Sequence, residues 1–222
     1  MKPPRLVALA VTLSLPLSYS FAGSQEELTP AQVHIRHVVD AINGTPDRVG
    51  LLSILETEAQ IAAQHATLAA ADTENLESMK LHIRHVRHAV DPSTEPEGPG
   101  KGYGVSKAAK GVETHIMLAT KSVGSSEGIV LHANHIATSA RNVVAWCTTI
   151  LAESEKVVSA ELAKDAADAT RKIAELARHV LEGVDANGDG RVSWQLREGG
   201  VAQAKQHGGL VKKAAASTSS DP

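Results

Sequence analysis

The sequence is poor in cysteine and in aromatic residues, and these absences limit what the protein can be. Cys147 is the only cysteine, which excludes an intrachain disulfide and covalent haem, whose attachment motif is Cys-x-x-Cys-His. We expect Cys147 to be a small buried residue. Phe, Trp and Tyr make up 2% of the chain, so few large side chains can line a wide apolar pocket. The composition predicts thin helices packed through small residues.

Long hydrophobic runs are also missing beyond the N-terminus. After residue 22 no stretch approaches the roughly 18 consecutive apolar residues of a membrane-spanning helix. At the start, Lys2 and Arg5 precede an apolar run over residues 6–17 and then small residues. This order is typical of a secretory signal peptide, here residues 1–22. We therefore expect the rest of the chain to be exported, periplasmic or secreted, and not embedded in a membrane.

Positive charge is not in excess. Without Lys2 and Arg5, 20 of the 22 basic residues remain against 25 acidic ones, a net charge of −5 with histidine neutral. This balance gives no reason to expect nucleic acid or an anionic membrane as a partner.

Helix-forming residues dominate the chain between residues 31 and 183, without sustained alternation of apolar and polar positions. The predicted helices cover residues 31–43, 46–71, 74–90, 104–121, 125–153 and 155–182. The segments between them carry the glycine, proline and cap residues that end helices, and residues 91–104 predict a surface loop. We expect an all-α helical bundle over residues 23–183, a short separate unit over 184–212 and a disordered tail over 213–222.

Histidines recur in a repeated segment. VHIRHVVDAIN, residues 33–43, matches LHIRHVRHAVD, residues 81–91, at His, Ile, Arg, His, Val and Ala. A looser copy, LHANHIATSAR over residues 131–141, keeps His-x-x-His and has a small residue four positions after the second histidine, as the others do. Such a small residue allows a neighbouring helix to approach.

Single histidines lie between these pairs at a regular spacing. His65 precedes His82 by 17 residues, and His115 precedes His132 by the same interval. The order pair, single, pair, single, pair predicts a bundle built from a duplicated helical hairpin and closed by the third pair.

Paired histidines at this spacing favour a metal site. Residues three apart lie about 60° apart around a helix, so both rings can converge on one ion, and neutral imidazole binds zinc, copper, nickel or iron. A single histidine from a neighbouring helix would supply a third ligand. The predicted ligand sets are His34, His37 and His65; His82, His85 and His115; and the pair His132 and His135, which completes one of them or forms a third site. The sequence leaves open which single histidine joins which pair.

Several other chemistries lack their residues. No Glu-x-x-His of di-iron bundles and no His-Glu-x-x-His of zinc proteases is present. Met79 and Met117 are too few for a methionine-lined copper(I) carrier. No Gly-x-Ser-x-Gly nucleophile motif occurs, so we expect binding rather than catalysis. His88, His179 and His207 are interpreted as ordinary surface or hydrogen-bonded histidines.

Two alternatives to a metal-binding protein remain open from the sequence. One is an electron-transfer protein that holds non-covalent haem between paired histidines. The other is a metal-free helical bundle that binds a protein partner or responds to pH, because imidazole titrates near neutrality.

After Gly183 the segment VDANGDGRVSWQ places short oxygen-bearing side chains at alternate positions. Asp185, Asn187 and Asp189 are followed by Gly190, which permits a sharp bend. This arrangement resembles the first half of an EF-hand loop. The resemblance implies calcium bound by these three side chains and by the backbone carbonyl of Arg191.

The resemblance ends at the twelfth loop position, where the EF-hand family has a bidentate glutamate and this chain has Leu196. Glu198 lies two residues later and is the candidate replacement. We therefore expect a weak, structural calcium site beside the histidine-rich bundle.

Overall fold

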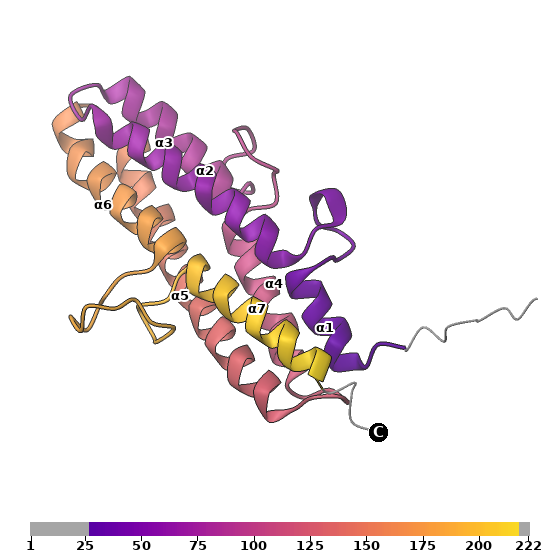
Figure 1. Cartoon of the computed structure of the whole chain (residues 1–222). Helices are drawn as coiled ribbons and strands as arrows, with labels where there is room; N and C mark the ends of the chain where they lie inside the picture. The colour runs from indigo at the N-terminus through magenta and orange to yellow at the C-terminus, as the bar shows by residue number, and fades with distance from the viewer. Residues whose placement is uncertain (1–26, 218–222) are drawn as a thin grey trace, which may run out of the picture.

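The computed structural model describes residues 27–217, and Figure 1 shows a bundle of long helices. The predicted signal peptide lies outside the described residues. The α-helices are α1 (Pro30–Val39), α2 (Leu51–Ala71), α3 (Leu76–Val90), α4 (Val105–Ala119), α5 (Glu127–Ser159), α6 (Ala163–Glu182) and α7 (Val201–Ser217), with a 3-10 turn, η1 (Pro46–Arg48). β-structure within the described part of the chain is limited to an isolated bridge between Ala41 and Val49. The prediction of an all-α bundle is confirmed.

The helices begin where the sequence supplies caps. Thr29 and Gln32 form a reciprocal capping box around Pro30 at the start of α1. The side chains of Asn75 and Ser126 accept backbone N–H groups at the starts of α3 and α5. None of the helices between residues 27 and 217 has both the length and the hydropathy to cross a bilayer.

α5 is the central helix, and it packs against α3, α4, α6 and α7. Its buried face is lined mainly by alanine and small aliphatic residues, as expected for closely packed thin helices. Cys147 lies on this face and is fully buried, as predicted. Burial raises the pKa of its thiol to about 12, so the side chain acts as a neutral core residue.

Several predicted helix boundaries are wrong, and α1 ends at Val39 rather than at the predicted residue 43. The predicted break at residues 153–155 is absent, because α5 continues to Ser159 and α6 begins only at Ala163. The predicted helix over residues 46–71 begins at Leu51. Gly50 precedes it, and a Cβ at Gly50 would lie 2.7 Å from backbone atoms at the end of α1, so this close approach of the chain requires glycine.

The C-terminal region differs more strongly from the prediction. α7 occupies the second part of the predicted 184–212 unit, from Val201, and continues into the predicted tail as far as Ser217. Residues 213–217 form the last turn of α7, and residues 218–222 lie outside the described residues. Gly208 makes this helix hard to predict, since glycine is a poor helix former. A Cβ at Gly208 would lie 2.7 Å from Leu52 Cδ1, so glycine allows α7 to pack against α2.

Residues 91–104 form the predicted loop, which is fastened to the bundle by a buried carboxylate. Glu58 on α2 is fully buried, and its Oε1 accepts the backbone N–H groups of Lys101, Tyr103 and Gly104 at 3.2, 2.9 and 3.3 Å. Arg87 at the end of α3 donates to the carbonyl of Thr94. The loop therefore has a defined position beside α2 and α3.

Candidate metal centres

Nine of the eleven histidines converge in three clusters that could each hold a metal ion. Each cluster joins two histidines, one turn apart on one helix, to a single histidine on a neighbouring helix. The first centre is His34, His37 and His115; the second centre is His65, His82 and His85; the third centre is His132, His135 and His207. Within each centre the candidate ligand atoms all lie within 4.8 Å of one another.

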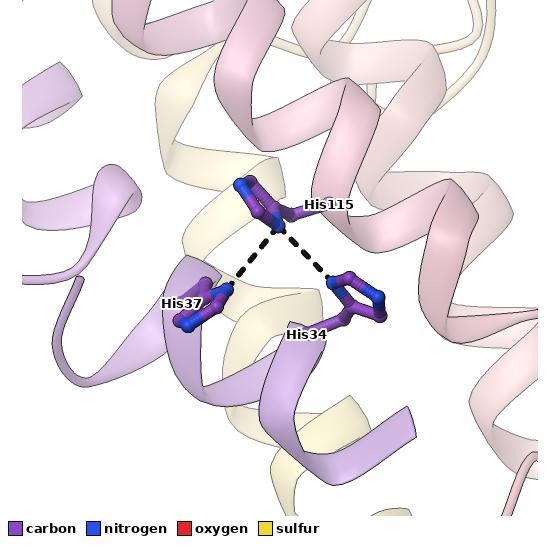
Figure 2. Close-up of side chains that lie close together, drawn as sticks. All are labelled: His34, His37 and His115. Atoms are coloured by element: carbon purple, nitrogen blue, oxygen red, sulfur yellow. Dashed lines mark hydrogen bonds between the residues drawn. The ribbon is translucent and has the colours of Figure 1, made fainter. Parts of the chain in front are cut away.

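The first centre shows how the sequence builds such a cluster (Figure 2). Ile35 and Val38 of α1 are buried in the core, which places His34 and His37 at the edge of that face. Both rings point toward His115 on α4, whose Nδ1 lies 3.2 Å from that of His34 and 3.3 Å from that of His37.

The other two centres repeat this geometry. In the second, His65 Nδ1 on α2 lies 3.1 Å from that of His82 and 3.3 Å from that of His85, both on α3. In the third, the Nδ1 of His207 on α7 lies 3.2 and 3.4 Å from those of the α5 pair. One nitrogen therefore stands close to two others in every centre.

The separations from the central nitrogen in each centre are also those expected around a shared ion. A tetrahedral ion with metal–nitrogen bonds of about 2.0–2.1 Å holds its ligand nitrogens about 3.3 Å apart. An imidazole nitrogen has one in-plane position, which carries either a proton or a lone pair. The central Nδ1 can therefore make one good hydrogen bond but not two. A metal ion would use all three lone pairs together.

The surroundings keep many of these imidazoles uncharged at neutral pH. Burial is the main cause that lowers the pKa of His37, His65, His85, His115 and His135, and the neighbouring histidines add charge repulsion when they are protonated. The same causes lower the pKa of His207 to about 4. Neutral imidazole is the form that binds metal, so these shifts reduce competition from protons.

The predicted partners of the single histidines are reversed in the structure. His65 was expected with His34 and His37, but it joins His82 and His85, while His115 joins the first pair. The cause is topology. α2 and α3 are directly connected and pack against each other, whereas α1 packs mainly against α4 and α7. The interval of 17 residues from His65 to His82, which recurs from His115 to His132, did not indicate which single histidine joins which pair.

His207 is the candidate ligand that the sequence prediction missed. It was interpreted as an ordinary histidine because α7 was not predicted, yet it completes the third centre around His132 and His135. A signal is present in the sequence: each single histidine is followed three residues later by leucine, in HATL from His65, HIML from His115 and HGGL from His207. That repeat would have identified the third single histidine.

The remaining two histidines serve other contacts. His88 is buried, and its Nδ1 lies 2.8 Å from the carbonyl oxygen of Glu95 in the 91–104 loop. His179 is buried near Trp146, with ring centroids 5.8 Å apart. His179 Nε2 also lies 3.3 Å from Arg178 Nη2. Both histidines are therefore buried and hydrogen-bonded, the second of the two predicted roles, and neither is a surface residue.

The EF-hand-like segment forms an exposed loop between α6 and α7. Asp185 Oδ2 accepts the N–H of Gly190 at 2.8 Å, while Asp185 Oδ1 accepts the N–H groups of Gly188 and Asp189 at 2.8 and 3.1 Å. The Asn187 side chain accepts the N–H of Asp189. The loop therefore curls around the Asp185 carboxylate.

Glu198, the candidate replacement for the missing glutamate, turns toward the protein instead of lying open to solvent. It is 2% exposed, and its Oε2 accepts the backbone N–H and the hydroxyl of Ser193 at 3.1 and 2.5 Å. Arg191, whose carbonyl is the other predicted ligand, has its N–H bound to Asp189 Oδ1, and Leu196 is 69% exposed. Among the described residues, the groups of three or more His, Cys, Asp or Glu ligands are the three histidine centres, and none includes Asp185, Asp189 or Glu198.

A surface groove of about 910 Å³ lies between α2 and α6, and no histidine lines it. No protein-family model, no curated protein and no solved structure matches this chain.

Proposed function

We propose that this is an exported metal-binding protein that holds one transition-metal ion at each of its three histidine centres, for storage, delivery or sensing. One observation carries the proposal. In every centre the Nδ1 of the single histidine lies 3.1–3.4 Å from the Nδ1 atoms of both paired histidines. The same spacing at all three centres supports the same kind of occupant at each, a bound metal ion.

The three imidazole donors favour a divalent transition-metal ion of intermediate softness. Imidazole nitrogens suit zinc, copper(II), nickel and iron, and three of them leave a coordination position for water or an exchanging ligand. Eight of the nine side chains are half-buried rather than fully enclosed, which favours reversible loading from solvent. Zinc is the first metal to test because it takes three histidines and a fourth ligand without further demands on geometry.

A bare ion fits these centres better than haem. The two axial imidazoles of a haem approach the iron from opposite faces of a wide macrocycle. Here the rings of His65 and His85 meet edge to face with centroids 4.6 Å apart, and those of His37 and His115 with centroids 4.8 Å apart. A porphyrin would have to separate both contacts.

Replacement of both His82 and His85 by alanine tests the proposal. Protein saturated with zinc and then desalted should retain three ions per chain in the wild type and two in the variant, by elemental analysis. Arg84→Ala is the matched control, since Arg84 is exposed between the two histidines on the same helix and should leave three. An unchanged zinc content in the double variant would contradict the second centre.

We further propose a weak calcium site in the loop that begins at Asp185. Its support is the EF-hand-like spacing together with the closure of the loop from Asp185 to Gly190. Replacing Asp185 and Asp189 by asparagine should abolish a calcium-dependent rise in melting temperature at millimolar calcium. A rise that persists unchanged in this variant would place the calcium effect elsewhere.

A further inference from the structure

The third centre differs from the other two, because an aromatic side chain covers one of its ligands. We propose that Trp194 is a positioning residue that holds His135 for metal binding, so that the third centre binds its ion more tightly and releases it more slowly than the other two. This inference rests on the proposed metal-binding function. Its test separates failure of the inference from failure of that function.

The contact between Trp194 and His135 is a full stack. The ring centroids lie 3.6 Å apart and the planes differ by 11°. At the first and second centres, within residues 27–217, the ligand rings make ring contacts with one another only. The indole of Trp194 is stacked on one face of the His135 ring and is itself 40% exposed. It therefore lies between that face of His135 and the solvent.

The loop that carries Trp194 is fastened to the same helix face as His135. Asn142 lies seven residues after His135 on α5, about 20° away around the helix. The Asn142 side chain is buried, and its Nδ2 donates to the carbonyls of Gln195 and Gly199 at 2.8 and 3.0 Å. Its Oδ1 accepts the N–H of Arg197 at 2.8 Å. These three bonds hold the backbone that directly follows Trp194.

Close packing at Gly199 fixes the loop further. A Cβ at Gly199 would lie 2.5 Å from Ser139 Oγ on α5 and 3.0 Å from Trp194 Cα. α7 begins at Val201, two residues later, and carries His207. One short segment therefore positions both the indole that covers His135 and the helix that supplies the third ligand.

Such support should strengthen metal binding in two ways. A ligand ring held in one orientation loses less freedom when it binds, and outer partners of metal-binding histidines typically contribute about 10–100-fold to affinity. Release of the ion requires His135 to turn away, and the stacked indole opposes that motion. His207 adds to the difference because it is 9% exposed, the most buried of the nine ligands.

The experiment uses the Trp146→Phe protein, in which Trp194 is the only tryptophan. Zinc release from the fully loaded protein to an excess of a chromogenic chelator should show two ions leaving quickly and one slowly. In the same background Trp194→Ala should accelerate the slow ion about 10–100-fold, and Trp194→Phe should restore most of the slow release. The helical circular dichroism signal should be unchanged.

A second readout reports the stack itself. Copper(II) should quench Trp194 fluorescence as the third centre fills, and His207→Ala should remove the quenching that occurs at one equivalent or below. Three ions bound in Trp194→Ala with the slow phase intact would overturn the role of Trp194 and leave the proposed function standing. A parent protein that binds no ion at all would overturn both.

Discussion

Replacement of His65 by alanine offers a quantitative test of the second centre. His65 is the central histidine of this centre, with its Nδ1 3.1 and 3.3 Å from those of His82 and His85. The change leaves a two-histidine pair on α3 and removes the link to α2. An ion that binds only the folded protein at 100 times its dissociation constant stabilises it by about 2.7 kcal/mol per site.

For a protein of this size, 1 kcal/mol corresponds to about 2–4 °C in melting temperature. Zinc bound at the second centre should therefore contribute about 5–10 °C. His65→Ala should lose that share of the zinc-dependent rise while its metal-free melting temperature changes little, because His65 is half-buried and its loss opens no large cavity.

The assay is a thermal melt with and without zinc, followed by circular dichroism. Gln64→Ala is the matched control, since Gln64 is the exposed neighbour on α2 and should keep the full rise. A zinc-dependent rise equal to that of the wild type in His65→Ala would refute the reasoning. If His65→Ala lowered the melting temperature equally with and without zinc, the reasoning would also be refuted, because His65 would then stabilise the protein through packing alone.

Three further predictions follow from other parts of the bundle. In metal-free protein, the pKa of His207 is lowered to about 4, so the unfolded chain takes up that proton first as the pH falls. The free energy of unfolding of the wild type, compared with that of His207→Ala, should therefore fall between pH 6.5 and 4 and the difference should level off below, as urea titrations of both proteins at each pH would show. Glu58→Ala should lower the free energy of unfolding by about 3 kcal/mol, measured in urea, because three backbone N–H groups lose their acceptor. Cys147 should resist thiol reagents in the native protein and react on unfolding, since it is fully buried with a raised pKa.

Local chemistry in the sequence predicted the helices and the paired ligands. The apolar residues around Ile35 and Ile83 recur at helical spacing, and the faces that they form fix where the neighbouring His-x-x-His pairs point. Both isoleucines are buried in the core. Such features depend on residues within one or two turns, so they can be predicted from one sequence.

The assembly of the centres depended on contacts between distant segments. His115 reaches His34 across 81 residues, and nothing in the local sequence near either residue specifies that α1 packs on α4. His207 was missed because Gly208 and Gly209 argue against a helix locally. Gly208 is favoured there by the close approach of Leu52, which appears only in the folded protein.

The measurement that tests the central claim most directly is elemental analysis of the protein, purified without an affinity tag or chelator and then saturated with zinc and desalted. The wild type should retain about three ions per chain. A variant with His65, His115 and His207 all replaced by alanine, one central ligand from each centre, should retain none while keeping its helical signal. Wild-type protein that retains no zinc, copper, nickel or iron after each is added back would contradict the account.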